Sequence, residues 1–304
     1  MTHLLKWGIA MLAALILGAA AFWYSFFTLH PYELTEQQKA EAYEYAQPSE
    51  LQMQLQPLTD TAWEFTYRSF DDALVNGQIH YPRPPAELNG PVPLLIGLHA
   101  MGRSQIRWWQ DSFKDNPTVT QSHRISRMAL DSGYAVIAID AREHGKRKNP
   151  DRLLPDIMWD MHLWGDKENY EQMIHNTVRD HRVLLDWLEQ QPALDASQFH
   201  VAGYSMGGQG ALLLAALDAR INRVLSIVPP HTDSKLALVS PLTWLDGLSD
   251  NEVLLVTAND DEHASESDNL ALFNALPTKR KRHISLDGGH ILPPDYVEKL
   301  KDWF

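Results

Sequence analysis

The segment from His200 to Leu217, HVAGYSMGGQGALLLAAL, surrounds Ser205 with glycines. Residues 203–207, GYSMG, have the spacing G-x-S-x-G and lie between a strand-like run and a helix-like run. In a sharp strand-to-helix turn of this kind, the serine hydroxyl is lifted clear of the sheet. Glycine is needed on both sides because a Cβ would collide with neighbouring backbone. The pattern therefore predicts that Ser205 is a nucleophile.

A glycine-rich loop that binds phosphate is the alternative interpretation of the same segment. The P-loop pattern requires a lysine after its last glycine, but Gln209 follows Gly208. The dinucleotide fingerprint G-x-G-x-x-G is broken as well, because Gly210 is followed by Ala-Leu-Leu. Neither phosphate-binding pattern fits, and this favours the nucleophile.

A serine hydroxyl is a poor nucleophile at its ordinary pKa, so it needs a base and an acid that orients the base. In sites with this turn, these residues follow the serine in the order Asp, then His. Asp260 and Asp261 end the apolar run VLLVTANDD, and His290 follows two glycines in LDGGHILPP. We predict a catalytic triad of Ser205, Asp261 and His290, with Asp260 as the alternative acid.

An oxyanion that forms during acyl transfer needs hydrogen-bond donors. One donor is expected from the main-chain N–H of Met206, at the positive end of the helix that follows Ser205. The second is expected from the loop LHAMGRS after the first core strand. We predict Met101 for this second donor, with Ala100 as the alternative.

The segment IDAREHG brings Asp140, Arg142 and His144 to another strand end. No second histidine stands four residues from His144, and no carboxylates have the spacing of metal ligands. We interpret the segment as a hydrogen-bonded structural loop, and we predict neither a metal nor a cofactor.

The elements that must hold these residues are five apolar runs, which are typical of strands buried on both faces. The runs are VPLLIGLHAMG, YAVIAIDAREHG, FHVAGYS, INRVLSIVPP and NEVLLVTANDD. Helix-like segments separate the runs, most clearly 176–190 and 206–217, and residues 62–70 and 73–81 resemble a hairpin. The sequence predicts an α/β fold with a mostly parallel central sheet, an antiparallel leading hairpin and helices on both faces. Functional loops gather at the carboxyl ends of such strands.

Residues 146–175 depart from this alternation and contain Trp159 and Trp164 but no strand-like run. We predict a small cap inserted over the site, with an elongated surface loop as the alternative. Together with Trp108 and Trp109, which follow the oxyanion loop, these tryptophans suggest an apolar or aromatic substrate pocket. Ordinary packing in the core and the cap is the competing explanation.

The N-terminal residues 1–32 predict a transmembrane anchor or a signal peptide. Residues 7–29 are almost wholly apolar and would extend roughly 35 Å as a helix, which is enough to cross a membrane. Lys6 precedes the segment, and acidic residues follow it, which favours a globular body outside the cytoplasm, on the periplasmic side in a bacterium. Cleavage near Ala19-Ala20-Ala21, and hence secretion, is the alternative.

The composition of the 304 residues is that of a globular protein, with a linker or short helix expected at 33–58 and one large domain at 59–304. A net charge of −13 disfavours a nucleic-acid partner. The chain has no cysteine, which excludes disulfides and thiolate catalysis. The sequence makes no prediction of the oligomeric state.

Over roughly residues 60–304, the chain resembles the α/β-hydrolase superfamily. The segments PVPLLIGLHAMG, AVIAIDAREHG, FHVAGYSMGGQGA, VLLVTANDDEH and DGGHI recur in the order of that family. The leading hairpin and VLLDWLEQQPALDASQFHVAGYSMGG resemble the branch of dienelactone hydrolases, acetyl xylan esterases and prolyl-peptidase-like enzymes.

The residues and this resemblance together lead to the expectation of a serine hydrolase that cleaves a small-molecule carboxylic ester through an acyl-enzyme. A peptidase or amidase is the alternative that the branch suggests. A non-catalytic, membrane-tethered binding protein on a hydrolase fold is the alternative from another class. The acyl and alcohol groups are not specified by the sequence.

Overall fold

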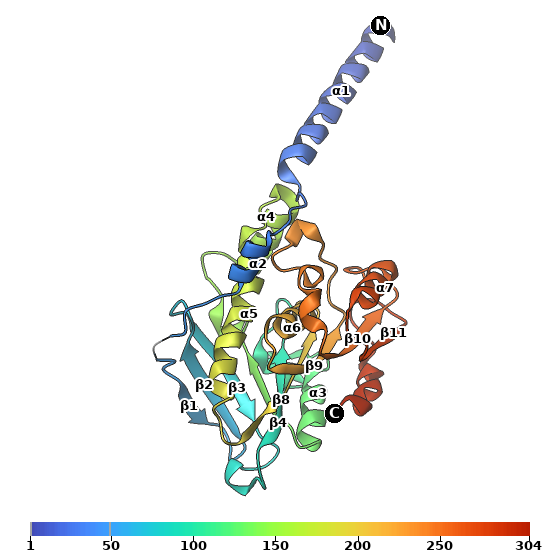
Figure 1. Cartoon of the computed structure of the whole chain (residues 1–304). Coiled ribbons are helices and arrows are strands. Elements are labelled where there is room, and N and C mark those ends of the chain that lie inside the picture. The colour runs from blue at the N-terminus through green and yellow to red at the C-terminus, as the bar shows by residue number, and fades with distance from the viewer. Residues whose placement is uncertain (1, 49) are drawn as a thin grey trace.

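The computed structural model describes residues 2–48 and 50–304, and within them the main sheet has nine strands. They are β1 (Gln54–Pro57), β2 (Ala62–Arg68), β3 (Leu74–His80), β4 (Val92–Leu98), β7 (Ala135–Ile139), β8 (Leu194–Tyr204), β9 (Ile221–Ile227), β10 (Glu252–Ala258) and β11 (Lys281–Leu286). Their spatial order is β1-β2-β3-β7-β4-β8-β9-β10-β11 (Figure 1). A short ribbon of β5 (Ser112–Phe113) and β6 (Asn116–Pro117) lies outside this sheet.

The sheet is antiparallel at its N-terminal edge and parallel elsewhere. Strand β2 pairs antiparallel with β1 on one side and with β3 on the other, and β3 also pairs antiparallel with β7. From β7 to β11, each strand is parallel to its neighbour. The predicted α/β-hydrolase fold, with a mostly parallel sheet and an antiparallel leading hairpin, is confirmed, and β1 adds a third strand to that hairpin.

The central strands are buried on both faces, which explains their continuous apolar runs. Successive strand residues point to opposite faces. Accordingly, Leu94 and Ile96 of β4 belong to one buried cluster and Leu95 to the other. In β7, Ile137 lies on the first face and Val136 on the second.

Helices cover both faces of the sheet (Figure 1). The first face packs against α5 (Glu168–Leu188) and α6 (Met206–Leu217). The second packs against α3 (Ser122–Asp131) and a 3-10 helix (Pro294–Trp303). Helix α7 (Glu266–Ala275) lies against β10. The expected alternation of strands and helices is therefore present.

Residues 33–58 do not behave as a free linker. Helix α2 (Glu36–Ala42) begins with a capping box in which the side chains of Thr35 and Gln38 bond each other's backbone N–H. Tyr43 is 2% exposed, and its hydroxyl donates to the carbonyl of Leu238. A short helix is present, as expected for this segment, and Tyr43 directly after it fastens the segment to the domain.

The segment 146–175 contains one complete helix, α4 (Leu154–Trp164), which ends at Gly165 in the left-handed conformation. Residues 168–175 belong to α5, which begins well before the helix expected at 176. The predicted insertion is thus a single helix and its flanking loops.

Helix α1 (Thr2–Phe27) extends away from the domain (Figure 1). Its residues Leu5–Phe27 are long and apolar enough to cross a membrane, and none of this span is buried. The base of α1 contacts the end of α4, where the indole N–H of Trp23 donates to the carbonyl of Leu163 (3.0 Å). The rings of Phe27 and Trp164 also meet edge to face at 5.4 Å.

Candidate active site

Ser205 lies in a strained turn between β8 and α6. Its φ of 57° is in the left-handed region, which non-glycine residues rarely adopt. A Cβ on Gly203 would collide with the carbonyl oxygen of Gly207, and a Cβ on Gly207 would collide with that of Leu98. Glycine at both positions therefore permits the turn, as the sequence pattern predicts.

The structure brings the side chains of Ser205, His290 and Asp261 together in one chain of contacts. The hydroxyl oxygen of Ser205 is 2.7 Å from Nε2 of His290. Nδ1 of His290 lies 2.9 and 3.0 Å from the two carboxylate oxygens of Asp261. Asp260, the alternative acid, is exposed and does not take part in this chain.

The carboxylate of Asp261 is held by a second donor. Its Oδ1 accepts the main-chain N–H of His263 (2.8 Å), and its side chain is 1% exposed. The ring of His263 meets that of His290 edge to face, with centroids 4.4 Å apart. His263 thus borders His290 on the side that faces the cavity, and this role of His263 was not predicted from the sequence.

The loop that carries His290 is fixed by two side chains that sequence reasoning missed. The hydroxyl of Tyr204 donates to the carbonyl of His290 (2.7 Å) and accepts from the N–H of Leu292 (3.0 Å). The carboxylate of Glu262 accepts the N–H of His290 (3.1 Å). The backbone N–H groups of Glu262 and His290 donate to this carboxylate, and these bonds hold the pKa of Glu262 below its usual value. Burial raises the pKa of Tyr204 to about 12, so its hydroxyl remains a donor.

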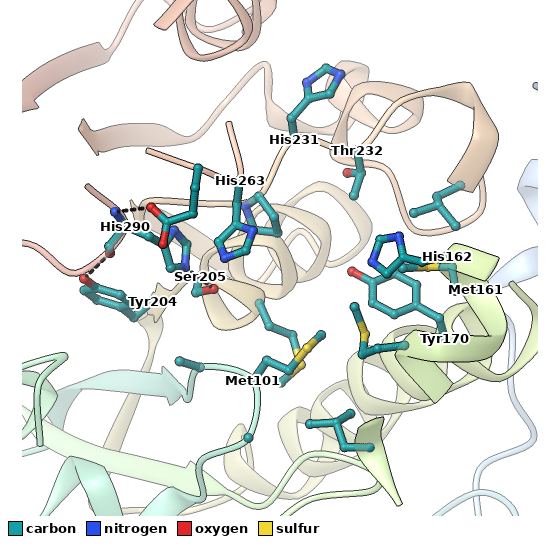
Figure 2. Close-up of a pocket in the computed structure, with 18 of the residues that line it drawn as sticks. Met101, Met161, His162, Tyr170, Tyr204, Ser205, His231, Thr232, His263 and His290 are labelled. Atoms are coloured by element: carbon teal, nitrogen blue, oxygen red, sulfur yellow. Dashed lines mark hydrogen bonds between the residues drawn. The ribbon is translucent and has the colours of Figure 1, made fainter. Parts of the chain in front are cut away.

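A cavity of about 810 Å³ opens above Ser205, between the His290 loop and α4 (Figure 2). Met101 and Met206, whose N–H groups are the predicted oxyanion donors, both line it. Met206 is the first residue of α6, so its N–H has no acceptor within the helix. Ala100, the alternative donor, also lines the cavity.

The walls of the cavity combine apolar residues with polar residues on both sides. Its apolar lining comes from Leu29, Ala100, Met101, Val119, Leu154, Met158, Met161, Met206, Leu236 and Ile291. Figure 2 shows His162, Tyr170, His231 and Thr232 across the cavity from His290. Besides these and the catalytic residues, the polar lining comes from Arg103, Thr120, Tyr204, Asp233, Lys235, Glu262 and His263. A concave cavity with apolar walls and polar groups near the reacting atoms is typical of a small-molecule site.

None of the four tryptophans that were expected at the substrate pocket lines this cavity. Trp108 is 1% exposed and packs against Gly97 of β4, where a Cβ would lie 2.5 Å from the indole ring. Trp109 stacks on His80 with ring centroids 3.9 Å apart. Trp159 and Trp164 are 62% and 52% exposed on the outside of α4. The apolar part of the pocket wall is built mainly from leucine and methionine instead.

The loop after β7 forms the expected hydrogen-bonded structure. The carboxylate of Asp140 accepts the main-chain N–H groups of Gln105 and Lys146 and the side-chain amide of Asn76, each at 2.8 Å. These bonds tie the loop that contains Met101 to the sheet. His144 is fully buried, and burial lowers its pKa to about 3. Within residues 2–48 and 50–304, no cluster of three or more His, Asp or Glu is arranged to hold a metal ion.

The comparisons with known proteins agree with this architecture. The family model described as alpha/beta hydrolase fold matches residues 121–253. The structure of acetyl xylan esterase 1 from Thermoanaerobacterium is similar, with a TM-score of 0.67 and 16% identity over 92% of this chain and 95% of that chain. The acetyl xylan esterase from a Paenibacillus species has a TM-score of 0.60 and 18% identity over 91% and 96%.

A further similar structure is a putative dienelactone hydrolase from Klebsiella pneumoniae, with a TM-score of 0.53 and 16% identity over 77% of this chain and 89% of that chain. The curated proteins give no match to the sequence. The chain thus has the α/β-hydrolase fold, and its structural relatives include the acetyl xylan esterases and dienelactone hydrolases that the sequence resembles.

Proposed function

We propose that this protein is a serine hydrolase that cleaves carboxylic esters of small molecules. The observation that carries the proposal is the continuous chain of contacts from the Ser205 hydroxyl through both nitrogens of His290 to the carboxylate of Asp261. Esterases among the structures with the same fold support an ester as the substrate.

In the first half of the reaction, His290 Nε2 takes the proton of Ser205 while Oγ attacks the carbonyl carbon. The N–H groups of Met101 and Met206 donate to the resulting oxyanion. When the tetrahedral intermediate collapses, the ester C–O bond breaks, and His290 gives its proton to the departing alkoxide. The alcohol leaves, and the acyl group remains on Ser205.

In the second half, His290 takes a proton from water, and the hydroxide attacks the acyl carbon. Collapse of this intermediate returns the proton to Ser205 and releases the carboxylic acid. Asp261 accepts from Nδ1–H throughout, which selects the productive tautomer and stabilises the imidazolium.

We infer further that α1 is an uncleaved membrane anchor, with the hydrolase domain outside the cytoplasm. The apolar span Leu5–Phe27 is long enough to cross a membrane, and none of it is buried against the domain. Cleavage after Ala21 would leave the apolar residues 22–27 as an exposed new N-terminus, whereas in an anchor they complete the helix. N-terminal sequencing of the protein purified from membranes tests this assignment. Recovery of a chain that begins after Ala21 contradicts it.

Replacement of Ser205 by alanine tests the catalytic proposal. The variant is expected to lose hydrolysis of p-nitrophenyl butyrate and labelling by a fluorophosphonate probe, because both require the serine oxygen. Gly90→Ala is a matched control, since a Cβ at Gly90 meets no atom within 4 Å. Labelling that persists in Ser205→Ala rejects the nucleophile. A matched amide should be cleaved far more slowly than the ester, and the reverse preference indicates an amidase.

A further inference from the structure

One wall of the catalytic cavity lies where α1 joins the domain. Leu29, two residues after the end of α1, lines the same cavity as Ser205 and His290. On the neighbouring wall, Leu154, Met158 and other residues of α4 line it as well. The helix that could cross a membrane therefore ends next to α4 (Figure 1), which forms this wall of the cavity.

The joint between α1 and the domain is fixed by contacts on both sides of the cavity. Tyr32 donates its N–H to the carbonyl of Ser234 (2.9 Å) and its hydroxyl to Glu171 (2.5 Å). The ammonium group of Lys167 lies 3.1 Å from the centroid of the Tyr32 ring. A Cβ on Gly165 would lie 3.0 Å from backbone atoms of Thr28, so the chain passes closely over the end of α4.

Helix α4 carries apolar side chains on its outer surface as well as toward the cavity. Trp159 is 62% exposed, while Ile157 and Met161 are buried, and Leu153, directly before the helix, is 54% exposed. The opposite rim has Ile291, which is 62% exposed and directly follows His290. Tryptophan is favoured at the level of lipid headgroups, where one end of the side chain is apolar and the other is hydrated.

The hydrogen bond from Trp23 to Leu163 fixes the end of α4 relative to α1, and therefore relative to a membrane that α1 enters. Because Trp23 belongs to the apolar span of α1, the end of α4 must lie at the surface of the membrane that α1 enters. Trp159 lies five residues before Trp164, which is roughly 8 Å along the helix axis. The exposed face of α4 is therefore within reach of the same interface.

We propose that α4 lies in the membrane interface and that the site takes a lipid ester directly from the bilayer. The long acyl chain enters the cavity between Leu29 and α4, and its ester carbonyl reaches Ser205. This proposal rests on the serine-esterase function and on the anchor proposed above, and it names the substrate class as membrane-resident esters with a long acyl chain.

The position of α4 can be measured with a fluorophore, because the chain has no cysteine of its own. Trp159→Cys in the full-length protein, labelled with a nitrobenzoxadiazole maleimide, is reconstituted into phosphatidylcholine vesicles. Neutral lipid is chosen because α4 also carries Asp156 and Asp160. Phe22→Cys in α1 provides the membrane reference. Leu58→Cys provides the aqueous reference, since Leu58 is 50% exposed and follows β1, an edge strand of the sheet that lies far from α1 (Figure 1).

The label at 159 is expected to emit at shorter wavelength than the label at 58 and to be quenched by brominated lipid, as the label at 22 is. A label at 159 that behaves like the label at 58 overturns the proposal, because α4 then faces water.

Activity gives an independent test with a soluble and an embedded substrate. Trp159→Glu should hydrolyse 4-methylumbelliferyl palmitate in vesicles at least 5-fold more slowly, with hydrolysis of soluble 4-methylumbelliferyl acetate unchanged. Leu58→Glu should change neither rate. Equal palmitate rates in Trp159→Glu and the unmodified protein reject entry from the membrane but leave the esterase intact. Failure of the unmodified protein to hydrolyse the acetate contradicts the proposed esterase function itself.

Discussion

The hydroxyl of Tyr204 donates to the main-chain carbonyl of His290 at 2.7 Å. Tyr204 immediately precedes Ser205, so one side chain connects the end of the strand that holds the nucleophile to the loop that holds the base. The same hydroxyl accepts the N–H of Leu292. The distance between Ser205 and His290 is thus maintained by a hydroxyl that bonds neither the Ser205 hydroxyl nor the His290 imidazole, and the Tyr204 ring also packs edge to face on the His290 ring.

Tyr204→Phe removes both of these hydrogen bonds without changing the shape of the ring. We expect kcat for a soluble ester to fall about 10-fold with little change in KM, because a buried hydrogen bond contributes about 1–3 kcal/mol and its loss loosens the His290 loop. Steady-state kinetics with p-nitrophenyl butyrate measure the two parameters. A KM that rises while kcat stays constant contradicts a positioning role for Tyr204.

Asp261→Asn should lower kcat by about 10⁴-fold, since an amide next to Nδ1 favours the wrong tautomer of His290. Asp260→Asn is the matched control, because Asp260 is exposed and only its main-chain N–H makes a contact in this turn, to the carbonyl of Gly288. It should keep near-normal kcat. The opposite ranking of the two variants identifies Asp260 as the acid.

Gly203→Ala should destabilise the domain by about 3 kcal/mol or more, because the new Cβ overlaps the Gly207 carbonyl and both atoms belong to the backbone. Denaturant unfolding followed by far-UV circular dichroism gives the free energy of unfolding. Gly90→Ala, which meets no atom within 4 Å, should unfold at the same denaturant concentration as the unmodified protein. An undisturbed Gly203→Ala contradicts the tight turn.

Trp108 and Trp159 should differ sharply in their effects on stability. Trp108→Ala removes a side chain that is 1% exposed and should cost about 3–5 kcal/mol of unfolding free energy. Trp159→Ala, at a position 62% exposed, should change it by less than about 0.5 kcal/mol in the absence of a membrane. Chemical denaturation in detergent solution compares the two variants, and similar losses contradict the placement of these side chains.

The buried histidines predict that stability falls as the pH drops below about 6.5. Burial lowers the pKa of His144 to about 3 and that of His200 to about 4, below the value of about 6.5 in an unfolded chain. Between these values the unfolded state binds more protons, so the free energy of unfolding decreases by up to about 1.4 kcal/mol per pH unit for each group.

His144→Phe should reduce this slope between pH 6 and pH 5, even though the variant is less stable at every pH. Denaturation midpoints at pH 7.5, 6 and 5 give the slope for both proteins. An unchanged slope shows that His144 is already protonated in the folded state.

The parallel strands could be predicted from the sequence because burial on both faces requires uninterrupted apolar runs. The geometry of the Ser205 turn could be predicted for a similar reason, since only glycine fits at positions 203 and 207. Both predictions depend on local chemistry that tolerates few alternatives. The packing of the segment before β2 was harder to predict. Its Tyr43 donates to the carbonyl of Leu238, which lies 195 residues later in the chain.

The positions of the tryptophans could not be predicted either, because they depend on neighbours that are distant in the sequence. A tryptophan fills a core, a pocket or a surface equally well, and its neighbours decide which. Trp108 is buried because Gly97, on a strand beneath it, leaves room for the indole. The role of Tyr204 depends on a partner 86 residues later in the chain, and no spacing in the sequence reveals it.

The segment between α1 and β2 is fastened to the domain by Tyr32, Tyr43 and Tyr45, whose hydroxyls donate to Glu171, Leu238 and Asp186. A flexible linker of about twenty residues would let the domain range over roughly 25 Å. With α1 in a membrane, this fastened segment instead keeps the domain at one height and one tilt. The catalytic cavity then stays at one distance from the lipid surface, so a large substrate that cannot diffuse to that distance is not hydrolysed.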